Sequence, residues 1–267
     1  MALRLFGDRT YGDEVYGELM GFNTLGPSAR RLYHDLWRDP HLQGLWLMNE
    51  GTSAIYDHAL GSRNNLTMVS SPTYGATAAP GFPGVTLTAA NKHYATGGQV
   101  NDFTSAAERS ALAVLTMNSR PSAAAIMGKY NNNQGWVWAL QASGQQQVLM
   151  GAGGASTIWR ISCTTNATGT PVMMGFSFSP LNAGTGTVAE PEDFTFYTNG
   201  VGSTVGANGA SGAVGVTTST NDFAIGAAVN SANSTFCADM TIGFVALFSA
   251  QKTAADFARW ARLGGFR

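Results

Sequence analysis

The chain contains the stretch Phe194-Thr-Phe-Tyr-Thr-Asn-Gly-Val201, in which apolar and polar side chains alternate up to an Asn-Gly pair. Successive side chains of a β-strand point to opposite faces of a sheet, so this alternation predicts a strand with one buried face. Asn199 and Gly200 readily adopt the positive φ angles of a tight hairpin turn. The stretch therefore predicts a β-hairpin whose first strand covers 194–198.

A similar pattern of short strands extends over most of the chain. From Gly44 onward, short apolar runs are separated by Gly, Asn, Ser and Thr at intervals of about ten residues, which is typical of β-sandwiches. The other candidate strands are 44–49, 66–69, 85–87, 110–117, 124–129, 136–141, 146–150, 157–162, 171–179, 223–227 and 240–248. We expect 201–222, which is built mostly from small residues, to hold strand and loop. The predicted fold is all-β, a two-sheet antiparallel sandwich over about 44–263.

Two short helices are expected beside the strands. One apolar stripe recurs at helical spacing after a Pro-Ser start, and it consists of Leu32, Tyr33, Leu36 and Trp37. This spacing predicts an amphipathic helix over 28–38. Near the end of the chain, Thr253 and Asp256 have the spacing of a capping box, and Gly264-Gly265 stops a second helix.

Composition excludes several classes of function. Of the 267 residues, 44% are hydrophobic and only 12% are charged, and the net charge is −1. A nearly neutral chain lacks the basic surface that nucleic acid or an anionic membrane attracts. No apolar run approaches the roughly 18 residues that a membrane helix needs, and acidic residues stand where a signal peptide would be apolar. We expect neither nucleic-acid nor membrane partners.

Charged residues are concentrated at the start of the chain. Residues 1–43 hold eleven of the thirty-one Asp, Glu, Lys and Arg residues. This change of composition divides the chain into an N-terminal arm with its amphipathic helix, 1–43, and a sandwich domain, 44–267. The first part of the arm is apolar without a clear period, and such a segment orders only against a partner.

We interpret this arm as an attachment device. Its predicted anchor residues are Leu3, Leu5, Phe6, Tyr11, Tyr16, Leu19, Met20, Phe22 and the helical stripe Leu32, Tyr33, Leu36 and Trp37. Burial of several such side chains at an interface would offset the entropy lost on ordering. The alternative is that part of the helical stripe packs on the chain's own sandwich.

The stretch Gly44-Leu-Trp-Leu-Met-Asn-Glu-Gly-Thr-Ser-Ala-Ile-Tyr-Asp57, followed by Gly61-Ser-Arg-Asn-Asn-Leu-Thr67, resembles the opening of laminin-G-like jelly rolls of the concanavalin-A-like superfamily. Later motifs resemble the same family in the same order: Ser110–Met117, Ile126–Lys129, Phe194–Gly200, Phe223–Gly226 and 239–248. The resemblance covers about 44–263 and implies two packed antiparallel sheets. Gly243 and Ala246 depart from it, since the family often has Asp and Arg there. Such a likeness implies a fold and leaves the function open.

No catalytic constellation stands out, and we predict that the protein is not an enzyme. Some glycoside hydrolases of this superfamily carry two carboxylates two residues apart on one strand. Here the matching pair, Glu190 and Glu192, is interrupted by Pro191 and precedes a strand instead of lying within it. No Ser-His-Asp order, phosphate-binding loop or HExxH pattern is present. We expect no cofactor apart from a calcium ion.

Calcium is implied by the family resemblance, since laminin-G-like domains often hold this ion at a loop rim. The matching ligands in this chain are Asp57, Asn64 and Asn65 in the opening loop, with Asp239 near the closing strand. Carboxylate and amide oxygens suit calcium, which takes six to eight hard ligands. The alternative is that Asp57 accepts hydrogen bonds from backbone amides in a turn.

Aromatic and amide side chains suggest a saccharide site. The candidates are Tyr130, Asn131, Trp136, Trp138 and Trp159. Aromatic rings stack on sugar rings, and amides bond hydroxyl groups. Trp136 and Trp138 are two apart and therefore share a sheet face, which could equally be the core face.

A sandwich rich in small residues, with few charges and an extra arm, resembles bacteriophage virion accessory proteins such as capsid decoration, head-fibre or tail-associated proteins. This resemblance implies a place in the virion, with other virion proteins and further copies of the chain (a homo-oligomer) as partners. The alternative function is a carbohydrate-binding module or adhesin for host-surface glycans. Without a secretion signal, Cys163 and Cys237 are expected to be free thiols.

Overall fold

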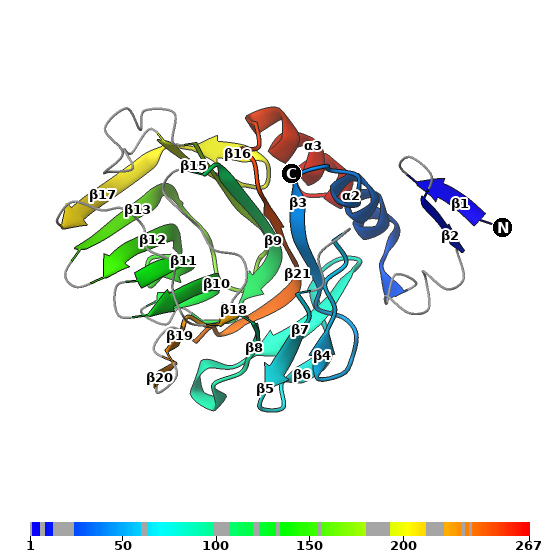
Figure 1. Cartoon of the computed structure of the whole chain (residues 1–267), viewed down its shortest axis with the longest axis horizontal. Coiled ribbons are helices and arrows are strands. Elements are labelled where there is room, and N and C mark those ends of the chain that lie inside the picture. Colours follow the sequence, from blue (N-terminus) through cyan, green and yellow to red (C-terminus); the bar gives the residue numbers. More distant parts are fainter. Residues whose placement is uncertain are drawn as a thin grey trace.

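The computed structural model describes residues 2–5, 9–12, 24–59, 64–98, 107–119, 123–131, 134–153, 156–179, 193–211, 222–230, 233–234 and 237–267. Within these residues, two antiparallel sheets pack face to face as a jelly-roll sandwich, with two helices at one side (Figure 1). The predicted all-β, two-sheet antiparallel fold is confirmed.

The first sheet has nine strands in the order β17-β13-β12-β11-β10-β18-β8-β5-β4. Their bounds are β4 Ala54–Ile55, β5 Leu66–Val69, β8 Tyr94–Gly97, β10 Ala123–Asn131, β11 Gln134–Gln141, β12 Gln145–Gly153, β13 Ser156–Thr165, β17 Val205–Ser211 and β18 Phe223–Ile225. Strands β10 to β13 follow one another in sequence and pair with their neighbours in space. They form the broad part of the sheet that matters for the site.

The second sheet has eight strands, in the order β16-β15-β14-β9-β21-β7-β6, and β3 also pairs with β21. Their bounds are β3 Leu42–Leu47, β6 Thr73–Ala79, β7 Phe82–Leu87, β9 Arg109–Met117, β14 Pro171–Phe178, β15 Phe194–Thr198, β16 Val201–Ser203 and β21 Met240–Phe248. Two separate hairpins are β1 Ala2–Leu5 with β2 Arg9–Gly12, and β19 Val229–Asn230 with β20 Asn233–Ser234. A 3-10 turn, η2, covers Ala89–Asn91.

The hairpin predicted at 194–201 is confirmed. Strand β15 ends at Thr198, and Asn199 and Gly200 have φ angles of 50° and 81° before β16 begins. The Asn199 side chain also accepts a hydrogen bond from the backbone amide of Met173 at 3.0 Å. The turn is therefore fixed both by its backbone conformation and by a contact with β14.

The space between the sheets is filled by a large apolar core with one polar bridge. Trp46, Trp136 and Trp138 are each at most 1% exposed there. Gln146 of β12 is fully buried among them. Its amide accepts from the Trp138 indole at 3.2 Å and donates to the Tyr197 carbonyl of the opposite sheet at 2.8 Å. This side chain joins the two sheets by hydrogen bonds through the core.

Helices α2 (Pro27–Trp37) and α3 (Ala254–Gly264) cover the outer face of the eight-stranded sheet. The predicted cap of α3 is confirmed, because Thr253 and Asp256 exchange the two hydrogen bonds of a capping box. The helices are joined by ion pairs, Asp35 with Arg259 at 3.0 Å and Asp39 with Lys252 at 2.7 Å. They therefore form one layer on the sandwich.

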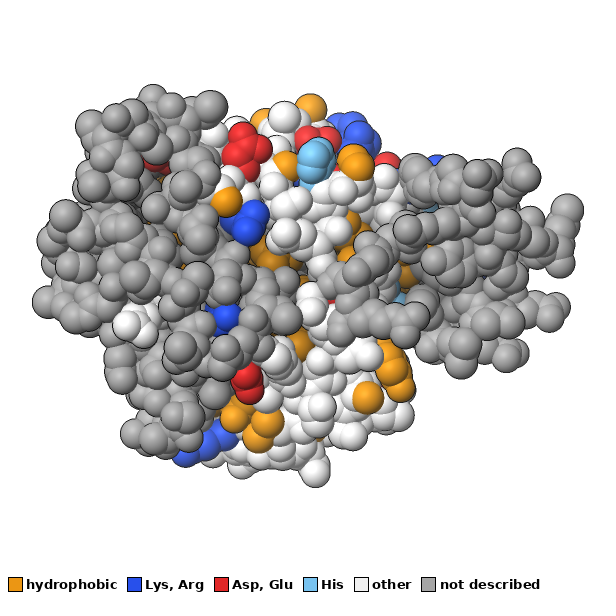
Figure 2. Space-filling view, in the orientation of Figure 1, with side chains coloured by type: hydrophobic (Ala, Val, Ile, Leu, Met, Phe, Trp, Pro, Cys, Tyr) orange, Lys and Arg blue, Asp and Glu red, His pale blue; other side chains and the backbone are white. Residues whose placement is uncertain are grey.

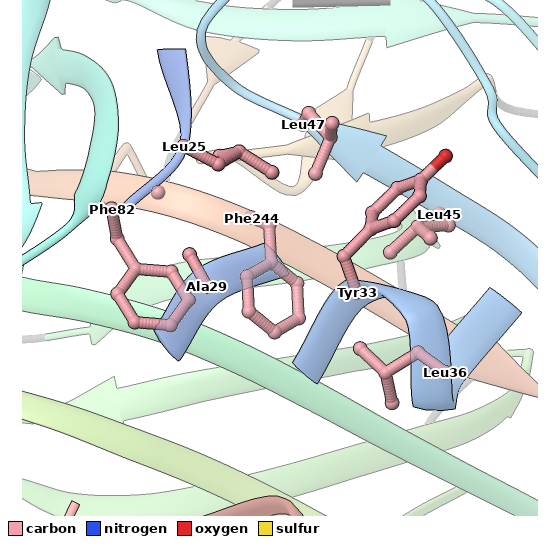
Figure 3. A pocket seen from close by; sticks show the side chains of 9 residues that line it. Leu25, Ala29, Tyr33, Leu36, Leu45, Leu47, Phe82 and Phe244 are labelled. Carbon is pink, nitrogen blue, oxygen red and sulfur yellow. The ribbon is translucent and has the colours of Figure 1, made fainter. Parts of the chain in front are cut away.

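The stripe of α2 is not available as an anchor. Leu32, Tyr33, Leu36 and Trp37 are all buried, and they pack with β3, β9, β21 and α3 in one apolar cluster. Tyr33 and Leu36 line a small apolar cavity between α2 and the sheet, together with Phe82 and Phe244 (Figure 3). The alternative is confirmed: this stripe packs on the chain's own sandwich.

The rest of the predicted anchor lies outside the side chains that the structure describes. This applies to Leu3, Leu5, Phe6, Tyr11, Tyr16, Leu19, Met20 and Phe22, although the backbone of β1 and β2 places Leu3 opposite Tyr11. From Thr24 onward the chain contacts the sandwich. Thr24 accepts from the Asn49 side chain at 2.8 Å, and the Gly26 amide donates to the Gly81 carbonyl at 2.8 Å.

Deletion of residues 2–23 is expected to leave the sandwich folded, because α2 and Leu25 themselves supply the contacts that cover the sheet. Circular dichroism should retain a strand spectrum, and the thermal transition should stay cooperative. Deletion of 2–38 is the comparison, since it exposes the apolar cluster beneath α2 and should abolish that transition. A lost transition in the shorter deletion would show that residues before Thr24 stabilise the fold.

Candidate functional site

The carboxylate of Asp57 holds the opening loop together. Its Oδ1 accepts from the backbone amides of Leu45 and Ala59, both at 3.0 Å, and its Oδ2 accepts from that of Asn64 at 3.2 Å. The Asn65 side chain in turn accepts from the Asp57 amide at 3.0 Å. These bonds occupy the carboxylate with backbone donors, which is the alternative to a calcium ligand.

Asp239 does not join this group. Asp57 bridges to Trp46, which pairs with Val245, and Asp239 lies six residues before Val245 along the chain. At ~3.3 Å per residue the two carboxylates are on the order of 20 Å apart. Asp239 instead accepts a hydrogen bond from the Ser119 hydroxyl. The four predicted calcium ligands therefore form no single site, and the described residues hold no group of three His, Cys, Asp or Glu suited to a metal.

Trp136 and Trp138 do share a sheet face, and it is the inner one. Trp138 packs edge-on to Phe176 of the other sheet at 5.4 Å between ring centroids, and Trp136 lies 6.3 Å from Phe223. Both are at most 1% exposed, so no sugar ring can reach them. Their place in the glycan set is corrected here, because the apolar inner face of β11 required them for the core.

The other predicted aromatics belong to the opposite, outer face of the nine-stranded sheet. Tyr130 packs with Val137 and Ala139, the β11 residues that alternate with the two tryptophans. In the register of β12 and β13, Leu149 is opposite Trp159. Since Leu149 packs against the same outer cluster, the Trp159 position is on the outer face as well. The Trp159 and Asn131 side chains lie outside the description.

We define the outer-face site by Tyr130, Gln147, Leu149 and the Trp159 position. Gln147 and Leu149 are half-buried, whereas Tyr130 is 8% exposed. The Gln147 amide makes no hydrogen bond within the part of the chain that the structure describes. Burial raises the pKa of Tyr130 to about 12, so its hydroxyl keeps its proton at neutral pH. The described side chains of the site thus combine the Tyr130 ring and the apolar Leu149 with the Gln147 amide.

The aromatic pattern of the sequence does not indicate Gln147 as a site residue. It stands two residues before Leu149, and its neighbour Gln146 faces the core. The alternation of β12, in which Gln146, Val148 and Met150 are buried and the residues between them are half-buried, is the signal that could have found it. Period two assigns Gln147 to the outer face once Val148 is assigned to the core.

Three other predictions concern the acidic pair Glu190 and Glu192, the two cysteines and membrane partners. Glu190 and Glu192 lie outside the described residues, so the absence of enzymatic activity stays a prediction. Cys163 is exposed in β13, Cys237 is buried before β21, and neither forms a disulfide bond. Among the described residues, no helix is long and apolar enough to span a membrane.

Comparison with known proteins found similar folds among solved structures. No family model matches the chain, and no curated protein matches it. A solved structure that does resemble it is domain 4 of AbnA, a GH43 extracellular arabinanase from Geobacillus stearothermophilus, in complex with arabinotriose. The TM-score is 0.56 at 14% identity, over 83% of this chain and 98% of that domain. The likeness is one of fold, a two-sheet antiparallel β-sandwich.

Two further similar structures contain this fold as part of a longer chain. The binding domain of botulinum neurotoxin DC in complex with SialylT matches with a TM-score of 0.56 at 10% identity, over 84% of this chain and 52% of that one. Trypanosoma rangeli sialidase in complex with 2,3-difluoro-KDN matches with a TM-score of 0.52 at 11% identity, over 84% of this chain and 32% of that one. The chain spans about half of the first and a third of the second.

Proposed function

We propose that this protein is a non-catalytic glycan-binding module that uses the outer-face site. The observation that carries the proposal is the likeness to AbnA domain 4, whose structure was solved with arabinotriose. The match extends over 98% of that domain. The toxin binding domain, solved with a saccharide named SialylT, supports the same class of ligand. In this chain the outer-face site offers an amide and apolar side chains, which are groups that can bind a saccharide.

Each residue of the site has a distinct task in this proposal. Leu149 and the Trp159 position are neighbours in the register, and we propose that this pair binds the carbon face of a sugar ring. Gln147, which makes no side-chain hydrogen bond among the described residues, offers both a donor and an acceptor to hydroxyl groups. A few placed polar groups on an apolar surface are the usual composition of a ligand site.

The expected virion role stays a prediction. It relied on an arm with a free helical stripe, and that stripe is buried under the helix layer. The eight arm residues before Thr24 remain its candidate anchors. A virion location and a homo-oligomer are compatible with glycan binding, because the helix layer and the outer-face site are on opposite sides of the sandwich.

Two substitutions test the proposed site by isothermal titration with the oligosaccharide that binds best on a glycan array. Trp159→Ala should weaken binding about tenfold or more, the change that ~1.4 kcal/mol produces. Gln147→Ala should weaken it about threefold to tenfold, as expected for one or two lost neutral hydrogen bonds.

The controls are matched in chemistry and placed elsewhere. Tyr56→Ala removes an aromatic ring that is 44% exposed on the opening loop, and Gln251→Ala removes an exposed amide before α3. Both should bind like the parent protein. Tyr56→Ala is compared with Trp159→Ala, and Gln251→Ala with Gln147→Ala. Equal weakening of binding within either pair, or unchanged binding in Trp159→Ala, would place the site elsewhere.

A further inference from the structure

The broad part of the nine-stranded sheet carries very few charges. Strands β10 to β13 and β17 contain two basic residues, Lys129 and Arg160, and no acidic residue. Lys129 is 1% exposed and pairs with the core residue Trp136. Arg160 is opposite Val148, a core residue, and so occupies an inner-face position. No charged residue of these strands occupies an outer-face position.

Charge is placed on the other side of the sandwich instead. The helix layer carries basic residues with acidic partners, among them Lys252 with Asp39 and Arg259 with Asp35. In the view of Figure 2, red and blue side chains gather at the upper edge, and the others are scattered. Strands β10 to β13 and β17 thus leave the outer-face site without a charged residue of their own.

We propose that the ligand of the outer-face site is an uncharged saccharide, an inference that rests on the proposed glycan-binding function. A sialic or uronic acid carboxylate loses hydration on binding and needs a cation or several charge-assisted donors in return. The strands of the site offer it neither. Neutral hydroxyl groups need single neutral partners, and the Gln147 amide supplies both a donor and an acceptor.

The lack of acidic residues in these strands also restricts how the saccharide can be bound. Recognition of sugar hydroxyls through a bound calcium ion requires carboxylate ligands at the site. Strands β10 to β13 and β17, which carry the site or adjoin it, contain none. Binding should therefore need no divalent cation, and it should depend on direct hydrogen bonds and ring contact.

The test uses the full chain and a glycan array that pairs neutral oligosaccharides with acidic ones of the same core, such as lactose with sialyllactose. Neutral pentose and hexose oligosaccharides should bind, with at least about tenfold preference over their acidic counterparts. Their affinity should change less than about twofold between ~0.1 M and ~1 M salt, which shortens the Debye length from about 10 Å to about 3 Å.

The outcomes separate the inference from the proposed function. Preferential binding of the sialylated or uronic partners, with affinity lost at high salt or in a chelator, would overturn the inference and leave glycan binding in place. Binding of no oligosaccharide on the array would overturn both. Neutral binding that Trp159→Ala weakens and Tyr56→Ala leaves unchanged supports both at this site.

Discussion

Replacing Asp57 with alanine is expected to lower the free energy of unfolding by about 3–5 kcal/mol, since each buried donor left without a partner costs about 1–3 kcal/mol. The carboxylate accepts from three backbone amides, and the residue is 7% exposed. Water has little access to replace it. Urea denaturation followed by tryptophan fluorescence measures the loss.

Asp222→Ala is the matched control, because it removes an exposed carboxylate close to the same sheet. Its effect should stay within about 0.5 kcal/mol. The same samples decide between the two roles considered for Asp57. A structural carboxylate makes stability independent of calcium, whereas a transition temperature that falls on chelation would restore the calcium interpretation. An Asp57→Ala loss below about 1 kcal/mol would contradict the structural role.

Gln146→Leu should cost about 2–4 kcal/mol, because it leaves two buried groups without partners at about 1–3 kcal/mol each. Leucine fills nearly the same volume, so the effect reports hydrogen bonds more than packing. The groups left alone are the Trp138 indole N–H and the Tyr197 carbonyl, which belong to different sheets. Urea denaturation again measures the change.

The adjacent residue supplies the control for this substitution. Gln147→Leu makes the same chemical change on a half-buried outer position with no hydrogen bond among the described residues, and should alter stability by about 0.5 kcal/mol or less. Equal losses of stability in the two variants would mean that the hydrogen bonds of Gln146 through the core do not stabilise the fold. A loss confined to Gln146→Leu would show that they do.

Much of the sandwich follows from the sequence. The hairpin at 194–201 and the strands with large apolar side chains are where alternation placed them. Strand β6, Thr-Tyr-Gly-Ala-Thr-Ala-Ala over 73–79, was missed, because small residues give weak alternation and two register shifts interrupt it. Strand β8 at 94–97 is short and equally rich in small residues. Pairing with neighbours, which is a tertiary property, makes these segments strands.

The misplaced site residues share one physical reason. A periodic apolar pattern shows that a face must be buried, and it does not identify what buries it. The α2 stripe left a foreign surface and the chain's own sandwich both open, and it covers the chain's own sheet. The spacing of Trp136 and Trp138 left a sugar platform and the core both open, and they fill the core. Only the strand register, which relates residues far apart in sequence, distinguishes the inner from the outer face of β11 and β12.

The position of β21 also determines the order in which the molecule can assemble. This strand, late in the sequence, lies in the middle of its sheet between β9, β7 and β3. A nascent chain therefore cannot complete the eight-stranded sheet until residue 248 has left the ribosome. Until then the inner edges of β9 and β7 have no partner, and exposed strand edges of this kind invite aggregation. Long-range pairing of this kind also favours slow folding. Expression at a lower temperature should therefore increase the fraction of the protein that folds before it aggregates.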